Sequence, residues 1–520
     1  MRPRPLGPIL IGALWALVSA SASATGPACD STLLKSLQVP RNTTLTSATL
    51  KPATATAPAY CEVRGVIGPA PSVINFAVGL PGAWNGRFLL GGDGGFDGSI
   101  ALPLDRLGQG YAVANSDSGH TTPAGNDASW AYNNRTAEID YGWRAAKETT
   151  QAAKRIVTSY YSRHIDYSYF EGCSTGGRQA LVAAQRYPEE FDGIVGGAPA
   201  HDLTGLAVEQ NWSLQQFFAN SGKGNITGKS SLLAKAVLAK CDKADGIEDG
   251  LIADPRACSF DPGELACAAG QDPATCFTPD QVNAVRNVYR GPSNASGFSY
   301  RGKPGGSESG WAIWLLTEVL PNPAQGGFTF SFMNYLFFEN DPGPSFDWKS
   351  FNFATDPQKG RFMARILNGT DPDLSDFRRN GSKFLLYHGW ADGLIPPFRT
   401  IEYYEEVVRE NRSRERTENF LRLFLVPGMD HCGAIGGGLK VWDRLAPLVD
   451  WVERGKAPER IVATQVDAKN VPVRTRPLCP YPSKAVWNGS GSTDDAANFR
   501  CVRSESSHRG DDDDRDRDDD

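Results

Sequence analysis

A serine in a glycine-rich turn is the first residue of this sequence that could carry out chemistry. Ser174 lies in the run EGCSTGGRQ, which contains the pattern Gly-x-Ser-x-Gly. The run follows a strand-like apolar segment, residues 167–171, and opens a helix-like segment, residues 178–186. Small neighbours permit the tight strand-to-helix turn that exposes a nucleophilic hydroxyl. The pattern predicts Ser174 as a nucleophile and the amide of Thr175 as a donor to an oxyanion.

A serine hydroxyl needs a base, and histidine usually supplies it. The chain has six histidines. With a nucleophile turn of this kind the chain order is serine, acid, histidine, which leaves His388, His431 and His508. His508 lies in a C-terminal segment too charged to fold, and His388, four residues before a candidate acid, is expected to be structural. His431, in the turn after the apolar run 421–426, is therefore predicted as the base.

The acid that orients this histidine is expected on a turn after an earlier strand. Asp392 meets that condition in the run HGWADGLIPP, which follows the strand-like residues 383–388. Asp430 is a poor rival because side chains of adjacent residues usually point apart, and Asp202 precedes the middle region of the chain. Asp392 is therefore predicted to hold His431 in the correct tautomer and to stabilise its charged form.

Two cysteines provide a geometric check on these assignments. Cys173 immediately precedes Ser174, and Cys432 immediately follows His431. A disulfide holds its Cα atoms roughly 5.5 Å apart, whereas a working pair needs the serine oxygen within about 3 Å of the imidazole. The two distances are compatible, so we predict a Cys173–Cys432 bridge that holds the nucleophile beside its base.

The elements that must position these residues alternate in type along the chain. Strand-like runs at residues 74–78, 87–90, 111–115, 167–171, 383–388 and 421–426 alternate with helix-like runs at 136–160, 399–409 and 439–453. This alternation predicts an α/β fold, a mostly parallel sheet with helices on both faces.

The middle of the chain has a different composition. Residues 203–378 contain four cysteines, many glycines and prolines, and an aromatic stretch. We predict a large inserted lid domain there, between the two parts of one core, residues 25–202 and 379–505. Its aromatic side chains could line a substrate pocket or pack within the lid; they include Trp311, Trp314, Phe328, Phe330 and Phe338.

The two ends of the chain predict export and a charged tail. Arg2 and Arg4 precede an apolar run at residues 9–18 and a small-residue cleavage site, which predicts a cleaved signal peptide over residues 1–24. The run is shorter than the ~20 residues that span a bilayer. Ten cysteines, an even number, suit disulfides in a secreted or periplasmic protein.

The net charge of −6 resides entirely in the last ten residues, so residues 506–520 are predicted to be a disordered acidic tail. The remainder is neutral on this count, which excludes the clustered positive charge of an electrostatic nucleic-acid binder. We also expect no membrane partner. The sequence does not determine the oligomeric state.

Three runs carry a family resemblance: Cys-Ser-x-Gly-Gly, HGWADGLIPP and LFLVPGMDHCG. With them the chain resembles the tannase and feruloyl esterase family, which includes the hydrolase of mono(2-hydroxyethyl) terephthalate. The resemblance implies an α/β-hydrolase core with a lid, the same three site residues and the same bridge beside them. It also implies four further bridges: Cys29–Cys61, Cys241–Cys258, Cys267–Cys276 and Cys479–Cys501.

The glycine-rich run at residues 91–96 resembles the family segment that supplies a second oxyanion amide. Asp93 interrupts the glycines here, so Gly94 and Gly95 both remain candidates.

An acidic loop in the middle region could bind a metal. Asp242, Asp245 and Asp249 lie three and four residues apart, and two of them precede a glycine. Hard oxygen ligands on a tight loop suit Ca²⁺, and the carbonyls of Ile247 and Leu251 could complete the shell. By itself such a loop is more often simply solvated. The resemblance implies a structural calcium that stabilises the lid without taking part in bond cleavage.

The reaction that these residues predict is acyl transfer to Ser174 followed by hydrolysis. The resemblance implies a feruloyl esterase-like serine esterase whose substrate is a small-molecule ester of an aromatic, phenolic acid. A tannase acting on gallate esters and a terephthalate monoester hydrolase are the alternatives within the family. From a different class, a non-catalytic secreted binding protein on a hydrolase scaffold remains open, and a peptidase is a weaker option.

Overall fold

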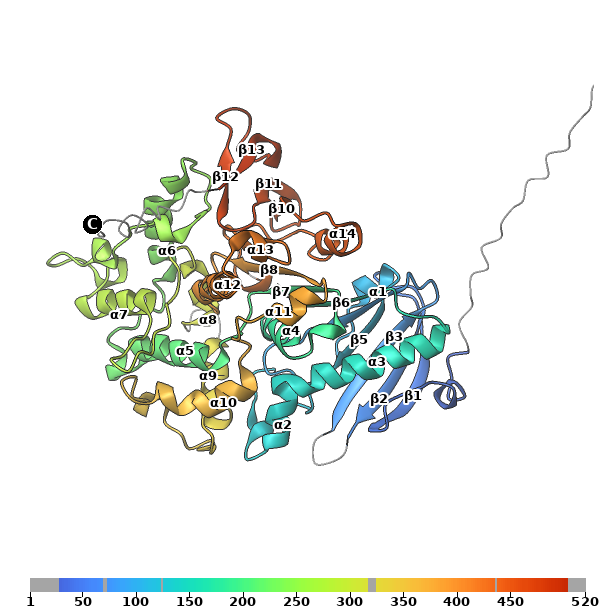
Figure 1. The fold of residues 1–520 in the computed structure, drawn as a ribbon. Coiled ribbons are helices and arrows are strands. Elements are labelled where there is room, and N and C mark those ends of the chain that lie inside the picture. The colour runs from blue at the N-terminus through green and yellow to red at the C-terminus, as the bar shows by residue number, and fades with distance from the viewer. Residues whose placement is uncertain (1–27, 69–72, 123–124, 317–323, 435–436, 504–520) are drawn as a thin grey trace, which may run out of the picture.

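The computed structural model describes residues 28–68, 73–122, 125–316, 324–434 and 437–503. The predicted signal peptide, residues 1–24, and the predicted acidic tail, residues 506–520, lie outside the described residues. Within those ranges the main sheet has nine strands in the order β1-β2-β3-β5-β4-β6-β7-β8-β9 (Figure 1). The strands are β1 (Thr43–Lys51), β2 (Tyr60–Ile67), β3 (Ile74–Pro81), β4 (Arg87–Gly91), β5 (Ala112–Ser116), β6 (Tyr167–Cys173), β7 (Gly193–Gly197), β8 (Lys383–Gly389) and β9 (Leu421–Val426).

The sheet is mostly parallel. Strands β5, β4, β6, β7, β8 and β9 pair in parallel, whereas β1, β2 and β3 form an antiparallel edge that joins the rest through β3 and β5. The sequence analysis anticipated β3, β4, β5, β6, β8 and β9 but missed β1, β2 and β7. In a parallel sheet the carboxyl ends of the strands share one edge, and the turns after β6 and β8 meet there.

Helices cover both faces of the sheet, as the sequence predicts. Alternate residues of each strand enter different apolar clusters, for example Phe88 and Leu90 on one face and Leu89 on the other. One face packs against α3 (Ala145–Tyr161), α4 (Thr175–Arg186) and α12 (Phe398–Glu410). The other packs against α1 (Leu104–Gly108) and α14 (Ala446–Arg454). Burial on both faces explains why these strands are continuous apolar runs.

The helix expected at residues 136–160 is interrupted near its start. It consists of α2 (Arg135–Ile139), a π-helical turn at residues 140–144 and then α3. The guanidinium of Arg178, fully buried in α4, donates to the carbonyls of Tyr141 and Gly142 in that turn. Those carbonyls are therefore satisfied from outside the helix, which supports the wider turn. The helix expected at residues 439–453 begins later, because α14 starts at Ala446.

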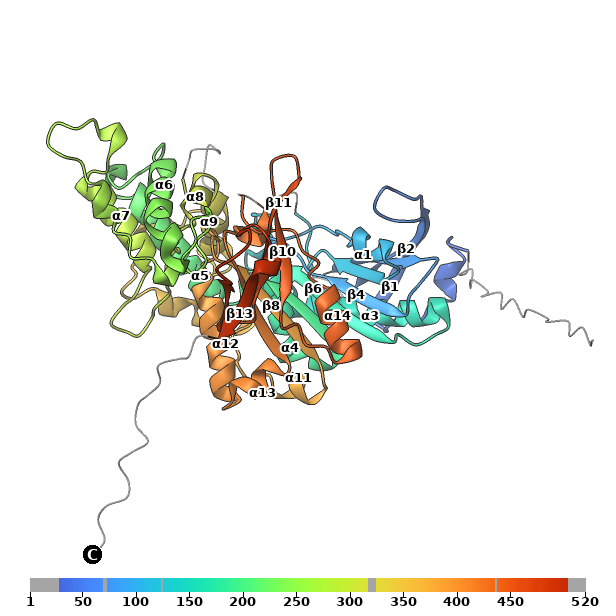
Figure 2. The same ribbon diagram turned by 90° about the horizontal axis from the view of Figure 1, so that it is seen from above.

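A helical insertion connects the neighbouring strands β7 and β8. Figures 1 and 2 show most of it at the end of the sheet far from β1 and β2, whereas its last helix, α11 (Ser375–Arg379), lies beside α4. One apolar cluster belongs to the insertion alone, and another is shared with the core through residues such as Phe96 and Tyr141. Its α-helices are α5 (Leu203–Phe218), α6 (Ser230–Cys241), α7 (Pro279–Arg290), α8 (Glu308–Trp314), α9 (Ala324–Tyr335), α10 (Arg361–Leu367) and α11 (Ser375–Arg379).

The C-terminal part adds the short helix α13 (Arg414–Glu418) and two small antiparallel sheets. The sheets pair β10 (Ile461–Val466) with β11 (Pro472–Leu478) and β12 (Ser483–Trp487) with β13 (Phe499–Arg503). In Figure 1 they lie at the top of the view, above β8 and α13. Among the described helices, none combines the length and apolar character needed to cross a membrane.

Candidate active site

Ser174 occupies a sharp turn between β6 and α4. Its backbone adopts φ 64° and ψ −119°, a conformation that L-residues rarely adopt. A side chain at Gly172 would lie 2.7 Å from the backbone of Gly176, so the turn requires small residues on both sides of the serine. The Ser174 amide donates to the Gly197 carbonyl at the end of β7. The turn therefore holds Ser174 at the carboxyl edge of the sheet.

Asp392 and His431 meet at the same edge. Nδ1 of His431 lies 2.8 Å from Oδ2 of Asp392, and Asp392 is fully buried. The other carboxylate oxygen, Oδ1, accepts hydrogen bonds from the amides of Leu394 and Ile395 at 2.9 and 2.8 Å. Asp392 thus has a fixed orientation that directs it at His431, the arrangement the sequence analysis proposed.

The two rival acids have other partners. Oδ1 of Asp430 accepts the backbone amides of His431 and Gly393, and Oδ2 accepts the indole N–H of Trp314 in α8. Asp202 caps the start of α5 by accepting the Gly205 amide. The structure therefore places Asp392, and neither rival, against the imidazole of His431.

A disulfide connects the serine turn to the histidine turn. Cys173 and Cys432 are bonded with their Cα atoms 6.1 Å apart, across 259 residues of sequence. The other four disulfides pair the cysteines as the family resemblance implied. Because Ser174 and His431 are each adjacent to a bridged cysteine, a covalent bond fixes the separation of their backbones.

The carboxylate of Asp392 controls the protonation of its neighbours. Burial raises its pKa, but the electrostatic interactions and hydrogen bonds with His431 and His388 lower it more, so the net pKa is well below the usual range. For His431, burial lowers the pKa, but the charge and hydrogen bond of Asp392 outweigh this and raise it above the ordinary 6.5. Burial and the charge of Asp392 raise the pKa of Asp430. Asp392 is therefore ionised and pairs with His431.

Three backbone amides near Ser174 are free to bind an oxyanion. Within the described ranges, the amides of Gly94, Gly95 and Thr175 donate to no protein acceptor, whereas the Phe96 amide donates to the Gly125 carbonyl. Gly95 has φ 57°, and a Cβ there would lie 2.3 Å from the Gly125 carbonyl, so this position requires glycine.

Hydroxyl groups fix the loop that carries these amides. Thr175 Oγ1 donates to the Gly95 carbonyl at 2.5 Å, and the Tyr141 hydroxyl donates to it at 3.1 Å. The sequence analysis did not identify Tyr141. Its residue type gave no signal, because its position depends on the π-helical turn and on Arg178.

An apolar pocket lies beside Ser174, between the core and the insertion. It is lined from the core by Phe96 and Ile395 and from the insertion by Phe328 and Phe332. Of the described residues in its wall, Gln210 alone has a side-chain amide. Among the described residues, the lining is Gly95, Phe96, Ser174, Thr175, Ala200, Leu203, Leu206, Ala207, Gln210, Phe328, Phe332, Leu394 and Ile395.

The predicted calcium loop is held by contacts of its own. Asp242 accepts the amides of Asp249 and Gly250, and Asp249 forms an ion pair with Arg476 of β11. Burial, aided by the charge of Asp249, raises the pKa of Asp245. Among the described residues, no three acidic, histidine or cysteine side chains form a metal-binding group.

Comparison with known proteins decides the family. The sequence model described as "Tannase and feruloyl esterase" matches residues 61–502, most of the chain. The chain belongs to the tannase and feruloyl esterase family. An uncharacterized esterase of Xanthomonas campestris pv. campestris is 38% identical over 95% of this chain and 93% of its own. Mono(2-hydroxyethyl) terephthalate hydrolase of Piscinibacter sakaiensis is 34% identical over 87% of this chain and 86% of its own.

A solved structure of the tannase and feruloyl esterase family shares the fold. Feruloyl esterase B from Aspergillus oryzae superimposes with a TM-score of 0.83 at 26% identity and covers 91% of this chain and 99% of that one. The predicted α/β-hydrolase fold is thereby confirmed, and the protein is a carboxylic ester hydrolase of this family.

The aromatic residues of the insertion have separate roles in this family member. Phe328 reaches the pocket beside Ser174, and the ring of Trp314 meets the His431 ring edge to face at 5.9 Å between centroids. Trp311 is fully buried, Phe330 packs on Trp348, and Phe338 packs on Phe337. Packing within the insertion therefore accounts for these last three.

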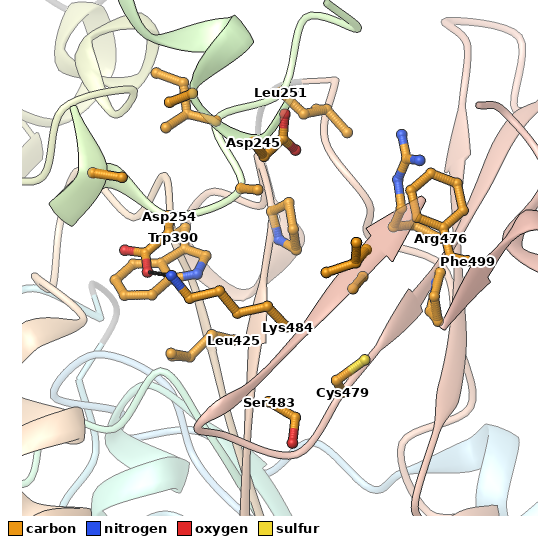
Figure 3. A pocket seen from close by; sticks show the side chains of 18 of the residues that line it. Asp245, Leu251, Asp254, Trp390, Leu425, Arg476, Cys479, Ser483, Lys484 and Phe499 are labelled. Carbon is orange, nitrogen blue, oxygen red and sulfur yellow. Dashed lines mark ion pairs between the residues drawn. The ribbon is translucent and has the colours of Figure 1, made fainter. Parts of the chain in front are cut away.

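A second hollow lies between the predicted calcium loop and the C-terminal strands. Figure 3 shows Asp245 and Leu251 on one side of it, Arg476 and Phe499 on another, and Trp390 beside the ion pair of Asp254 with Lys484. Its lining excludes Ser174, Asp392 and His431. This hollow belongs to the junction between the insertion and the C-terminal strands.

Proposed function

We propose that this esterase uses Ser174, His431 and Asp392 as a catalytic triad to hydrolyse esters of aromatic carboxylic acids. The observation that carries the proposal is the 2.8 Å contact between His431 and Asp392 on one side of the Cys173–Cys432 bridge, with Ser174 on the other. Neutral His431 carries its proton on Nδ1, which faces the carboxylate. Its other nitrogen, Nε2, is then free to accept the serine proton.

The reaction proceeds in two steps. Ser174 Oγ attacks the ester carbonyl while Nε2 of His431 takes its proton and then passes it to the departing alcohol, leaving an acyl-serine. Water next attacks the acyl carbon and gives a proton to His431, which returns it to Ser174 as the acid leaves. Asp392 stabilises the imidazolium in both steps.

The oxyanion of each tetrahedral intermediate would be bound by the Thr175 amide and by that of Gly94 or Gly95. Their freedom from protein acceptors supports this role. Removing one such donor typically costs about 10²–10³ in turnover.

The pocket beside Ser174 favours an uncharged aromatic acyl group. Rings of Phe96, Phe328 and Phe332 would pack against an aromatic substrate. A free carboxylate in this apolar space would lose its hydration without gaining a cationic partner from the described lining. We therefore propose that feruloyl or cinnamoyl esters are the preferred substrates, that gallate esters come second, and that terephthalate monoesters are least favoured.

An ester panel tests the function and the preference together. Methyl ferulate, methyl gallate and mono(2-hydroxyethyl) terephthalate are compared by kcat/KM on wild type and Ser174→Ala. We expect turnover of ferulate above terephthalate monoester in wild type and no turnover in the variant. Equal activity of the two proteins would reject the triad, and failure of a serine-directed phosphonate to label Ser174 would favour a binding protein. A peptide substrate tests the peptidase alternative.

We further propose that the chain is exported and that residues 203–378 act as a lid over the core formed by residues 25–202 and 379–505. The five disulfides support an oxidising compartment outside the cytoplasm. The side chains that the insertion contributes to the pocket support the lid. Mass spectrometry of the exported protein tests the signal peptide; a mature chain that retains residues 1–24 would contradict it.

We propose a structural Ca²⁺ at the loop of Asp242, Asp245 and Asp249, with the carbonyls of Ile247 and Leu251. The donor chemistry fits, because three carboxylates lie within eight residues and the raised pKa of Asp245 reflects burial and the nearby charge of Asp249. Binding requires Asp242 and Asp249 to release part of their present contacts. The ion would stabilise the lid and take no part in ester cleavage.

A further inference from the structure

A second imidazole contacts the carboxylate of Asp392. Nε2 of His388 lies 3.2 Å from Oδ2 of Asp392, the oxygen that Nδ1 of His431 also contacts. Both His388 and Asp392 are fully buried. Asp392 therefore accepts from two histidines and two backbone amides, which saturates the carboxylate.

The surroundings of His388 determine which of its nitrogens carries a proton. Nε2 faces two acceptors, Oδ2 of Asp392 and the Ile395 carbonyl at 3.0 Å. A bare nitrogen would be repelled by both oxygens, so Nε2 must carry hydrogen. Nδ1 lies 2.9 Å from Oγ1 of Thr400, a hydroxyl that can donate to it. The neutral Nε2–H tautomer satisfies all three contacts.

We propose that His388 is a positioning residue for the triad, which donates to the oxygen of Asp392 that His431 uses and so limits how strongly Asp392 holds the imidazolium. This proposal rests on the proposed function. His388 touches no substrate, and it acts only through Asp392. A second function follows from the Ile395 bond, because Ile395 lines the pocket beside Ser174 and His388 therefore ties the acid turn to the pocket wall.

The effect of losing His388 has a definite sign. Without its hydrogen bond, Asp392 Oδ2 interacts with His431 alone, and the imidazolium of His431 becomes more stable. The pKa of His431 then rises, and activity at acid pH is lost, because His431 must be neutral to accept the serine proton. The other charged groups around His431 are Asp430 and Lys303, and the titratable neighbour of His388 is His201.

A matched pair of substitutions tests the donor. His388→Leu removes it, whereas His388→Gln can place an amide N–H near the position of Nε2. With methyl cinnamate, which has no ionisable group, we expect the acid limb of kcat/KM in the Leu variant to move up by about half to one pH unit. At pH values below the pKa of His431, this shift corresponds to about a three- to tenfold loss of kcat/KM. The Gln variant should restore most of it.

Two further variants separate positioning from stability. Val407→Ala leaves a cavity where α12 packs in the apolar cluster that also contains Phe384 and Leu386 of β8, and it does not touch Asp392. It should lower Tm and leave the pH profile unchanged. Thr400→Val removes the hydroxyl that faces Nδ1 and should shift the limb in the same direction as His388→Leu, by less. Equal shifts in the Leu, Gln and Val407→Ala proteins, or an unshifted Leu protein, would overturn the proposal.

A measurement on a natively folded chain avoids the risk that His388→Leu fails to fold. In ¹⁵N-histidine-labelled Ser174→Ala protein, the ring nitrogens of His388 should show the neutral Nε2–H tautomer. Observation of the Nδ1–H tautomer would reject the proposal whatever the variants do. If Ser174→Ala instead keeps full activity, the triad fails rather than the role of His388, so the two failures are distinguishable.

Discussion

Two disulfides border the loops proposed to carry function, and they connect very different lengths of chain. Cys173–Cys432 joins segments 259 residues apart, so the turns that carry Ser174 and His431 are connected through the packing of the whole sheet and one covalent bond. Cys241–Cys258 closes only 17 residues around the acidic loop of the insertion. The first region depends on distant segments, and the second is nearly self-contained.

The two regions also differ in how the protein compensates the charge of their carboxylates. Asp392 has a partner for each oxygen, and its pKa is held well below the usual range because His431 and His388 outweigh the effect of burial. In the acidic loop, burial and the charge of Asp249 raise the pKa of Asp245. The Asp392 carboxylate is satisfied by protein groups alone, whereas the proposed cation at the acidic loop would relieve the repulsion between Asp245 and Asp249. Substitutions at the Asp392 site should therefore affect catalysis, and substitutions in the acidic loop should affect stability.

The largest effect should follow from Asp392→Asn. The amide would present the wrong partner to Nδ1 of His431 and favour the unproductive tautomer, so kcat on methyl ferulate should fall by about 10⁴. Asp245→Asn is the matched control in the acidic loop and should keep its kcat. A loss below tenfold for Asp392→Asn, with the fold intact, would contradict the assignment.

Removing the two disulfides should next distinguish the regions by stability. The chain-entropy estimate scales with the logarithm of loop length, so Cys173→Ser/Cys432→Ser should lose about 2 kcal/mol more than Cys241→Ser/Cys258→Ser in urea unfolding. Only the first pair should also lower kcat, because Ser174 and His431 would no longer be held together. Equal losses of kcat in both double variants would show that the long bridge has no special role in the site.

Chelation with EGTA should lower Tm by a few degrees and leave kcat at 25 °C unchanged. The reason is that a cation bound only to the folded state stabilises it by mass action. The shift should disappear in Asp245→Asn/Asp249→Asn, which removes two carboxylates. A Tm indifferent to Ca²⁺ and EGTA in wild type would contradict the calcium proposal and leave the triad untouched.

A smaller effect should come from Glu308, which is buried in the insertion. Burial raises its pKa to about 7, although the Tyr289 hydroxyl and the Gly306 amide partly oppose this. The folded pKa exceeds the unfolded one, so this stability is complete below about 4.5 and is lost as pH rises through about 7. The Tm advantage of wild type over Glu308→Gln should therefore shrink by a few degrees between pH 5 and pH 8. A Tm difference between the two proteins that stays constant from pH 5 to pH 8 would contradict this role of Glu308.

The sequence anticipated the core site because its residues carry local signals. Glycines around Ser174, cysteines beside Ser174 and His431, and the strands before Asp392 and His431 are all visible in short runs. The structure brings Asp392 and His431 together as those runs suggested.

What sequence reasoning missed depends on long-range packing. Tyr141 approaches Gly95 because Arg178, buried in another helix, fixes the π-helical turn, and no local pattern encodes that contact. The edge strand β1 was missed because Thr43–Lys51 is largely polar and half exposed, and β7 because its sequence GIVGG is mostly glycine. His388 was expected to be structural, and its contact with Asp392 fits its place four residues earlier.

The helical insertion leaves the sheet after β7 and returns at the adjacent strand β8, where Gly197 pairs with Tyr387. The insertion is thus one long connection whose two ends lie on neighbouring strands. The entropic cost of closing such a connection grows only slowly with its length. Helices here could therefore be lengthened, trimmed or exchanged between homologues at little cost to the nucleophile turn. Selection can change the pocket wall that includes Phe328 and Phe332 while the turn that carries Ser174 keeps its structure.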